Sequence, residues 1–337
     1  KHNKFNPFGK IAFNHQLKSR LKVRRDLYNL HQENNFTDPA DPVFVIGLPR
    51  SGTTLLFNLL SLDKSHRSPL YWEIMHPFPM VKSSREKIKR EKKTNRELTL
   101  AKTLIPKLRG MHTIRANSPE ECEQIATINV KSFVYMCMAD VPEYVEYLKN
   151  CPFDSVFMWH KRFFQALEIN GRPKRWLLKD PSHIGHLPEI LKTYPKAKFI
   201  HIHRDPTEAV ASFCSLTKNI RSSFSKKVNT SDIGSTVIDF WKHNLNKGME
   251  DRKNLSSNQI IDINYQDFIS SPLNQVKSAY LQLGFDMTIE TENNIENYLS
   301  QGQTTSKSLH QYSLKEFGLN EKNVRDEFRD YMLNYDF

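Results

Sequence analysis

The chain has 337 residues, of which 38% are hydrophobic and 26% charged, so it is long enough to bury the core of a large domain. Its formal net charge of +12 favours an anionic ligand, nucleic acid or a membrane surface as a partner. The sequence has no RNP motif, zinc-ligand spacing or regular basic–aromatic interleaving, which argues against nucleic acid and against a metal site.

The first predicted element is a basic amphipathic helix over about Phe13 to Gln32, within an N-terminal extension of residues 1–41. Its lysines and arginines, Arg20 among them, are expected on a solvated face. The turn-forming residues Asp38 to Pro42 then predict a linker. Leucines recur at helical spacing and form the expected buried side: Leu17, Leu21, Leu27 and Leu30.

The stretch from Pro42 to Leu60, PVFVIGLPRSGTTLLFNLL, is the most informative part of the chain. Val43 to Ile46 are apolar and mostly β-branched, which predicts a buried parallel strand. Thr54 to Leu60 have the apolar spacing of a helix. The glycine-bounded turn between them places backbone N–H groups at a helix N-terminus, which predicts a cradle for a phosphate group.

The cradle differs from a nucleoside-triphosphate P-loop at one position. Gly47 and Gly52 match the glycines of G-x-x-x-x-G-K-[ST], but Thr53 stands where the lysine should be. The positive charge comes instead from Arg50, inside the loop. One guanidinium with backbone N–H groups and hydroxyls suits a single terminal phosphate better than a β/γ-phosphate grip with Mg²⁺.

A helical insertion is predicted over about residues 80–170. Residues 82–97 form a charge-dense helix with a solvated face. Ser118-Pro119-Glu120-Glu121 has the cap, first-turn proline and capping box of a helix start, and we expect that helix to run to about Val134. The aromatic-rich residues 135–170 are also expected to be helical.

Further strands are predicted after the insertion, each followed by a polar exit and a helix. Strands that alternate with helices imply parallel pairing with right-handed crossovers. We therefore expect an α/β fold, a P-loop-like parallel sheet flanked by helices, within a single domain of residues 1–337. The further strands cover Arg175–Lys179, Ala197–His203 and Ile260–Asn264.

Ligands of an open parallel sheet bind beyond the carboxyl ends of its strands. The exits in this chain are Arg50 to Thr54, Lys179 to His183, Arg204 to Asp205, and Tyr265. Three exits carry cations that can meet phosphate or sulfate, and the fourth carries an aromatic ring that can stack on a base. A surface ion pair between Arg204 and Asp205 is the structural alternative.

Two of these exits resemble the donor-binding motifs of a known family. Residues 47–54, GLPRSGTT, resemble the 5′-phosphosulfate loop of sulfotransferases that use 3′-phosphoadenosine 5′-phosphosulfate (PAPS), and His203-Arg204-Asp205-Pro206 resembles their 3′-phosphate motif. In that family a serine eight positions after the arginine shares the 3′-phosphate, and Ser212 has that spacing here. Over about residues 6–335 the chain resembles bacterial-type sulfotransferases, a broad family that also includes tyrosylprotein sulfotransferases.

The resemblance implies transfer of a sulfuryl group from PAPS to a hydroxyl or amine, with 3′-phosphoadenosine 5′-phosphate as the product. By analogy with phosphoryl transfer, this reaction needs in-line geometry and charge neutralisation, and no metal is expected. Arg204 and Ser212 would hold the 3′-phosphate, while Arg50, and after it Lys179, would stabilise the leaving group. The loop residues implied in donor binding are Arg50, Ser51, Gly52, Thr53 and Thr54.

Two residues are candidates for the base that removes the acceptor proton. Glu73 lies 23 positions after Arg50, near the spacing at which the tyrosylprotein and glycan branches place a catalytic glutamate. His183 lies about where cytosolic small-molecule sulfotransferases place a catalytic histidine. Glu73 is preferred and His183 is the alternative. A salt bridge of Glu73, and a helix cap or core packing of His183, are the structural explanations.

The resemblance also implies contacts with the rest of the nucleotide. Tyr265, in Asn-Tyr-Gln-Asp, resembles a segment whose tyrosine lies against adenine, although a core tyrosine is the alternative. Lys307 and His310 are expected to close over the 3′-phosphate.

The acceptor is expected to be a small molecule bound by the insertion, and the oligomeric state stays open. Four scattered cysteines favour a reducing compartment, and no apolar run reaches the roughly 18–20 residues of a membrane span, so a cytoplasmic location is expected. Because the sequence begins at Lys1 without methionine, the Golgi lumen after removal of an anchor is the alternative. Rival functions are a P-loop kinase or NTPase and a non-catalytic nucleotide- or polyanion-binding module.

Overall fold

The computed structural model describes residues 5–104, 114–302 and 313–337. The chain divides into two compact units. We call the first the helical unit, which comprises Lys1–Ala40, Ser68–Pro173 and Leu216–Val228. We call the second the sheet unit, which comprises Asp41–Arg67, Lys174–Ser215 and Asn229–Phe337.

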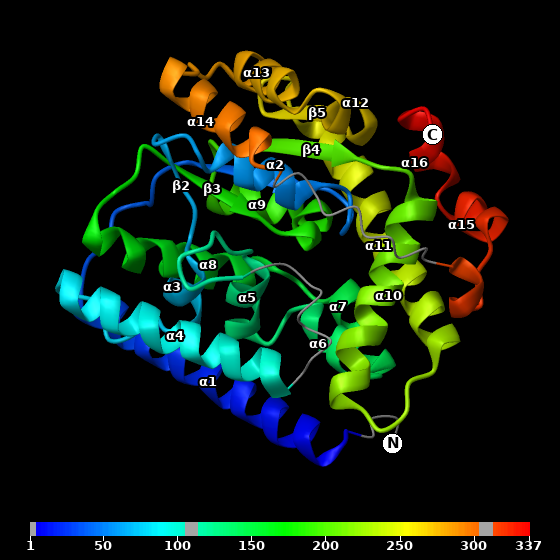
Figure 1. Ribbon diagram of the computed structural model, residues 1–337, viewed down its shortest axis with the longest axis horizontal. Helices are drawn as coiled ribbons and strands as arrows, with labels where there is room; N and C mark the ends of the chain where they lie inside the picture. The colour runs from blue at the N-terminus through cyan, green and yellow to red at the C-terminus, as the bar shows by residue number, and fades with distance from the viewer. Residues whose placement is uncertain (1–4, 105–113, 303–312) are drawn as a thin grey trace. The chain divides into compact units, whose positions relative to one another are not determined.

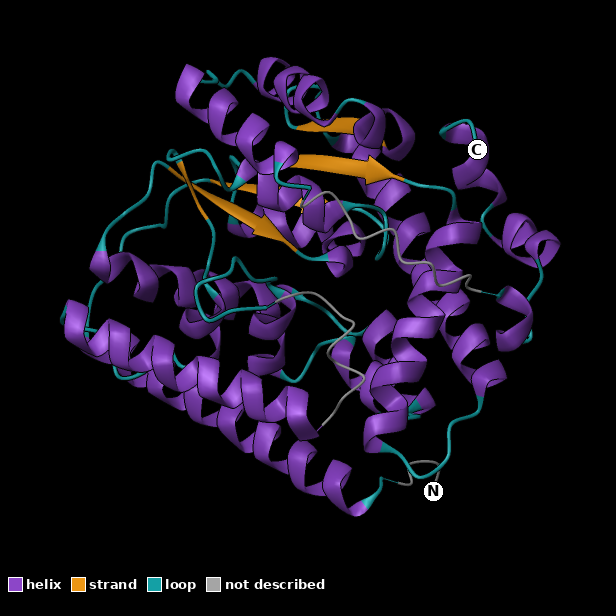
Figure 2. Ribbon diagram, viewed as in Figure 1, coloured by secondary structure: helices purple, strands orange, loops and turns teal. Residues whose placement is uncertain are grey.

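The sheet unit contains a five-stranded parallel sheet in the order β2-β3-β1-β4-β5 (Figures 1 and 2). The predicted α/β fold with a parallel sheet is therefore confirmed. The sequence did not predict β2, because two residues are too few to carry a hydrophobic pattern. The strands are β1 Pro42–Ile46, β2 His66–Arg67, β3 Arg175–Lys179, β4 Lys198–His203 and β5 Ile260–Asn264.

The register of the sheet brings the strand ends together. Val45, near the end of β1, pairs with Lys179, the last residue of β3. His203, the last residue of β4, pairs with Asn264, the last residue of β5. Because the strands are parallel, the polar exits predicted to bind the ligand leave from one edge of the sheet.

Helices cover both faces of this sheet (Figure 1). Because successive side chains of a strand point to opposite faces, the sheet packs against helices on both sides. On one face, Val43 and Val45 pack with residues of α2 Thr53–Leu60 and α13 Pro272–Leu283. On the other face, Phe44 packs against the 3₁₀ helix Pro181–His186. The remaining α-helices that lie in or enter this unit are α9 Leu187–Thr193, α10 Pro206–Phe224, α11 Thr230–Asp251, α12 Tyr265–Ser270, α14 Ile289–Ser300, α15 Glu321–Glu327 and α16 Arg329–Asn334.

The helical unit holds the N-terminal helix and the predicted insertion, and its α-helices include one that is charge-dense and mostly exposed, as expected for residues 82–97. Among the residues that the structure describes, no helix is both long and apolar enough to cross a membrane. The α-helices of this unit are α1 Pro7–Glu33, α3 Tyr71–Met75, α4 Ser84–Leu104, α5 Glu123–Ala126, α6 Val134–Met138, α7 Pro142–Asn150 and α8 Asp154–Leu167.

The helix α1 begins earlier than predicted, and its buried face includes Leu27, as expected, but not Leu21. It starts at Pro7, because the Asn6 side chain accepts a hydrogen bond from the N–H of Gly9 at 2.6 Å. The prediction that Leu21 is buried and Arg20 solvated is wrong, since Leu21 is 43% exposed and Arg20 only 1%. Arg20 tolerates burial because it donates to the carbonyls that end α3, those of residue 74 at 3.0 Å and residue 75 at 2.8 Å.

The predicted helix from Ser118 to Val134 is also wrong. Pro119 forms an isolated antiparallel bridge with Leu70, which holds this segment in an extended conformation. The helical part is limited to α5 and the 3₁₀ turn Thr127–Asn129, which ends at Val130 with φ of 58°. Pairing with a distant segment therefore outweighed the local capping signal.

Candidate functional site

The predicted phosphate loop of the sheet unit joins β1 to α2. It turns tightly through three residues with positive φ: Gly47 at 146°, Arg50 at 70° and Gly52 at 92°. Gly52 is the N-cap of α2, and no side chain among the described residues caps this helix. The first-turn N–H groups and the positive end of the helix dipole therefore lie at the loop, as an anion cradle requires.

The loop contains a buried hydroxyl that suits a ligand oxygen. Ser51 is fully buried, and its Oγ has no hydrogen-bond partner among the described residues. A buried polar group without a partner is unfavourable by about 1–3 kcal/mol, so a ligand that supplies an oxygen would relieve this cost. The residues of the loop therefore fit an anionic group such as phosphate.

Arg50 connects the loop to the exit of β4. Its Nε donates to Ser212 Oγ at 3.0 Å, and Arg204 Nη1 donates to the backbone carbonyl of Arg50 at 2.6 Å. The sequence assigned Arg50 to one end of the donor and Arg204 with Ser212 to the other. In the structure these three residues share one hydrogen-bonded network.

Arg204 has a carboxylate partner that the sequence analysis missed. Its Nε and Nη2 donate to Glu208 Oε2 at 3.0 Å and 2.6 Å. The structural alternative was an ion pair between Arg204 and Asp205. It does not account for the contacts of Arg204, because Asp205 Oδ1 accepts instead from the N–H and hydroxyl of Thr207, each at 2.7 Å. The spacing of four positions between Arg204 and Glu208 was the signal available in the sequence.

Tyr265 lies beside the loop and not in the interior of the core. It is half-buried and begins α12, a helix that the sequence analysis did not assign there. The Arg204 guanidinium carbon lies 4.2 Å from the centre of its ring. A Cβ atom added to Gly52 would lie 2.8 Å from Tyr265 Cδ2, so glycine is what allows the loop to approach the ring.

Lys179 reaches the loop from β3. It is buried at the end of the strand, and its Nζ donates to Thr54 Oγ1 at 3.0 Å. This contact joins the β3 exit to the first turn of α2, whose first residue is Thr53. Cations from three strand exits, Arg50, Lys179 and Arg204, therefore surround the same loop and provide positive charge for an anionic ligand.

The two candidate bases belong to different units. His183, in the sheet unit, is buried and packs edge-on against Phe44 with the ring centres 5.0 Å apart. Asp180, and not His183, caps the 3₁₀ helix that contains the histidine. Glu73, in the helical unit, is 7% exposed, and its Oε2 accepts from the N–H of Leu70 at 2.9 Å. Glu73 therefore caps α3.

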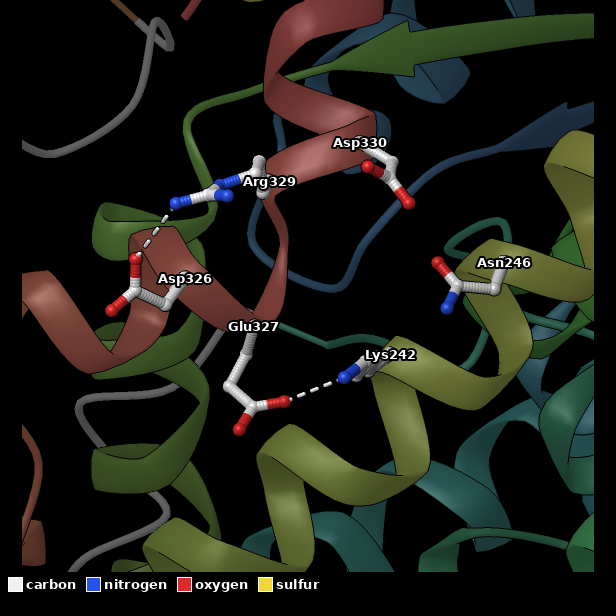
Figure 3. Close-up of a pocket in the computed structure, with 6 residues that line it drawn as sticks. All are labelled: Lys242, Asn246, Asp326, Glu327, Arg329 and Asp330. Atoms are coloured by element: carbon white, nitrogen blue, oxygen red, sulfur yellow. Dashed lines mark hydrogen bonds and ion pairs between the residues drawn. The ribbon is translucent and has the colours of Figure 1, made fainter.

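Two predicted contacts with the 3′-phosphate, Lys307 and His310, lie outside the described residues. A separate surface pocket of about 370 Å³ lies between α11 and the helices α15 and α16 (Figure 3). Lys242 in this pocket pairs with Glu327 at 2.7 Å, and Arg329 pairs with Asp326 at 3.6 Å. Because both cations already face carboxylates, this pocket does not have the character of an anion site.

Comparison with known proteins agrees with this geometry. A profile described as the sulfotransferase family matches residues 42–289. The sulfotransferase STF1 of Mycobacterium tuberculosis has a TM-score of 0.82 and 27% identity, covering 97% of this chain and 87% of its own. The sulfotransferase STF9 of Mycobacterium avium has a TM-score of 0.83 and 24% identity, covering 99% of this chain and 87% of its own, and shows the same fold.

An omega-hydroxy-beta-dihydromenaquinone-9 sulfotransferase of Mycobacterium bovis is 27% identical over 266 residues. The match covers 75% of this chain and 64% of that relative, so the chain spans less than two thirds of the relative's length. The profile match includes the phosphate loop and the strand exits β3, β4 and β5. The resemblance found in the sequence is confirmed, and the chain belongs to the sulfotransferase family.

Proposed function

We propose that this chain transfers a sulfuryl group from PAPS to a small-molecule acceptor by in-line displacement, without a metal ion. The observation that carries the proposal is the network of Arg50, Ser212 and Arg204 beside the N-terminus of α2, which no described side chain caps. Family membership supports the reaction class, and the cations at the strand exits suit a ligand with two separate anionic groups.

The donor is held by two groups of residues. The loop residues Ser51 to Thr54 bind the 5′ end through backbone N–H groups and hydroxyls. Arg204 and Ser212 bind the 3′-phosphate, and Tyr265 packs against the adenine. Lys307 completes the 3′-phosphate site.

The reaction needs charge neutralisation and one proton transfer. The acceptor oxygen or nitrogen forms a bond to sulfur while the bond from sulfur to the bridging oxygen breaks, and that electron pair stays on the 5′-phosphate of the departing nucleotide. Arg50 and Lys179 stabilise the negative charge that develops there. Glu73 takes the acceptor proton, with His183 as the alternative base.

The acceptor class is suggested by a relative, whose name says that it acts on omega-hydroxy-beta-dihydromenaquinone-9. By this likeness we favour a hydroxyl over an amine as the accepting group. The helical unit, which contains the insertion, binds the acceptor, and the reaction takes place in the cytoplasm.

A ligand comparison tests this function against its two rivals. A ligand that binds only the folded protein stabilises it and so raises its melting temperature. At a ligand concentration of one hundred times Kd, the stabilisation is about 2.7 kcal/mol. We expect 3′-phosphoadenosine 5′-phosphate to raise it strongly, and ATP with Mg²⁺ or heparin to raise it little. The reverse order would favour a kinase or a polyanion-binding module. Labelled PAPS with a panel of ω-hydroxylated apolar compounds then tests the transfer itself.

A further inference from the structure

Three side chains from distant parts of the sheet unit form a hydrogen-bonded row behind Arg204. His203, the residue before Arg204, is buried at the end of β4. Its Nε2 lies 2.7 Å from Asp262 Oδ1 on β5, and its Nδ1 lies 3.0 Å from the hydroxyl of Tyr331 on α16. Figure 1 shows α16 near the end of β4.

The row continues beyond Asp262, where Arg252 Nη2 donates to Asp262 Oδ2 at 2.6 Å. Tyr331 is therefore tied to the side chain of His203, the residue directly before the one that is expected to bind the 3′-phosphate.

The protonation states give each hydrogen bond a direction. Burial opposes ionisation of Asp262, but hydrogen bonds from His203 and Arg252 lower its pKa overall, so it accepts as a carboxylate. Burial lowers the pKa of His203, which is therefore neutral near pH 7 and carries its proton on Nε2, toward Asp262. Burial raises the pKa of Tyr331, which keeps its proton and donates it to His203 Nδ1.

The same directions argue against a metal site in this cluster. His201, His203 and Asp262 each offer one ligand atom, and these atoms lie within 4.8 Å of one another. However, His201 Nδ1 faces the Arg252 guanidinium at 3.2 Å, and that guanidinium also pairs with Asp262. A cation would have to displace the His203 proton and lie beside a permanent positive charge.

We infer that Tyr331 and His203 are positioning residues that fix the end of β4, from which Arg204 extends, so that the C-terminal helix α16 becomes a supporting part of the donor site. The inference rests on the proposed binding of the 3′-phosphate by Arg204. Tyr331 is 128 positions from His203 in the sequence, so a contact between α16 and β4 controls where the Arg204 side chain begins. The hydrogen bonds leave Arg204 little freedom to shift when the nucleotide binds.

The test compares two tyrosines of the same C-terminal segment. Tyr331→Phe removes the hydroxyl that donates to His203 Nδ1 but keeps the ring. Tyr335→Phe is the matched control, because the Tyr335 hydroxyl contacts Arg252 and the Tyr335 ring stacks on His203 with centres 3.6 Å apart. Calorimetry measures Kd for 3′-phosphoadenosine 5′-phosphate and for adenosine 5′-phosphate, which differ only in the 3′-phosphate.

We expect Tyr331→Phe to raise the Kd for the 3′-phosphorylated nucleotide about three- to tenfold while changing that for adenosine 5′-phosphate less than twofold. Tyr335→Phe should leave the ratio of the two constants unchanged, even where it lowers the melting temperature. If Tyr331 had a purely structural role, Tyr331→Phe would change the Kd values of both nucleotides by the same factor. An unchanged ratio of the two Kd values would therefore overturn the inference.

A second variant covers the case in which Tyr331→Phe does not fold. Asp262→Ala removes a side chain that is 43% exposed and takes away the acceptor of His203, so it should shift the ratio in the same direction. If the unaltered chain shows no preference for the 3′-phosphorylated nucleotide, the proposed function itself fails. If that preference is present in the unaltered chain and survives in both variants, only the positioning inference fails.

Discussion

Arg204 donates two hydrogen bonds to one carboxylate oxygen of Glu208, from Nε at 3.0 Å and from Nη2 at 2.6 Å. Both side chains are partly exposed, at 22% and 49%. A phosphate that binds Arg204 must therefore compete with a carboxylate that already occupies two of its donors. Substitutions of the two residues should therefore change phosphate binding in opposite directions.

Replacing Arg204 with alanine should weaken binding of 3′-phosphoadenosine 5′-phosphate about tenfold to a hundredfold, because a charge-assisted hydrogen bond contributes about 1.5–3 kcal/mol. Binding of adenosine 5′-phosphosulfate, which has no 3′-phosphate, should change much less. Glu208→Gln is the counterpart and should tighten binding of the first nucleotide about two- to fivefold, since exposed ion pairs contribute about 0.2–1 kcal/mol. Calorimetry measures these dissociation constants for each variant and for the unaltered chain, and equal weakening of both nucleotides by Arg204→Ala would remove Arg204 from this role.

Transfer should survive removal of divalent metal ions. Thr53 stands where a P-loop has its lysine, and the positive charge near the loop comes from Arg50, Lys179 and Arg204. We expect the rate of transfer from PAPS to change less than twofold in EDTA. A rate that falls in EDTA and returns with added Mg²⁺ would count against a metal-free mechanism and in favour of a P-loop enzyme.

Glu73 and His183 can be separated as bases by substitution. Glu73→Gln keeps the size of the side chain and an oxygen that can accept from the Leu70 N–H, so α3 should remain capped. Turnover should fall about 10²- to 10⁴-fold while nucleotide affinity changes little. His183→Asn should lower turnover much less.

The nucleotide affinity of both variants, measured beside their turnover, separates loss of the base from loss of donor binding. The assignment is falsified if Glu73→Gln retains turnover within about threefold while His183→Asn is inactive with normal nucleotide binding.

Gly52→Ala should destabilise the protein and impair nucleotide binding. Alanine at φ of 92° is strained, and its Cβ would lie 2.8 Å from the Tyr265 ring. Strain and overpacking together should lower the free energy of unfolding by about 2–4 kcal/mol.

Gly284→Ala is the control, because Gly284 also has a positive φ, 68°, but a Cβ atom added there would meet nothing within 4 Å. Urea denaturation of both variants should show a loss of only about 1 kcal/mol for Gly284→Ala, and similar losses would exclude the contact with Tyr265 as the cause.

Acid should remove a stabilising contribution of Asp63. Burial alone would raise the pKa of Asp63, but hydrogen bonds from the Ser65 N–H, the Ser65 hydroxyl and the Tyr280 hydroxyl lower it overall. A carboxyl whose pKa is lower in the folded state than in the unfolded state stabilises the protein at any pH above the unfolded pKa, about 3.9. This contribution is lost as the pH falls through the pKa of the folded state.

Asp63→Asn should therefore lower the free energy of unfolding by about 1–3 kcal/mol at pH 7, and the difference from the unaltered protein should shrink below about pH 4. Asp286→Asn, at an exposed position, should change it by less than about 0.5 kcal/mol at any pH. Unfolding curves recorded from pH 7 to pH 3 check this, and a difference that stays constant with pH would contradict the account.

Much of the fold could be predicted because short apolar runs and glycine turns are local signals. The runs in β1, β3 and β5 identify buried strands, and parallel pairing follows from the helices between them. The loop from Gly47 to Gly52, and the spacing from Arg204 to Ser212, likewise depend on neighbouring positions. These features located the candidate donor site before any contact was known.

Contacts between distant segments could not be predicted in the same way. The bridge between Leu70 and Pro119 replaced a predicted helix, and the carbonyls that end α3 allowed Arg20 to be buried. Local propensity is worth a few tenths of a kcal/mol per residue, so a single long-range pairing or a satisfied buried charge outweighs it.

The sequence by itself determined the parallel sheet, the phosphate loop and the positive charge at the strand exits, because residue type and spacing encode them directly. Only the tertiary structure decided that Glu208 accepts hydrogen bonds from Arg204, that Tyr265 lies against Gly52, and that Tyr331 contacts the end of β4. The physical reason is that a hydrogen bond or a ring contact depends on distances of a few ångströms between side chains. Those distances are set by how α12, α16 and the sheet pack, and not by the order of residues within any one element.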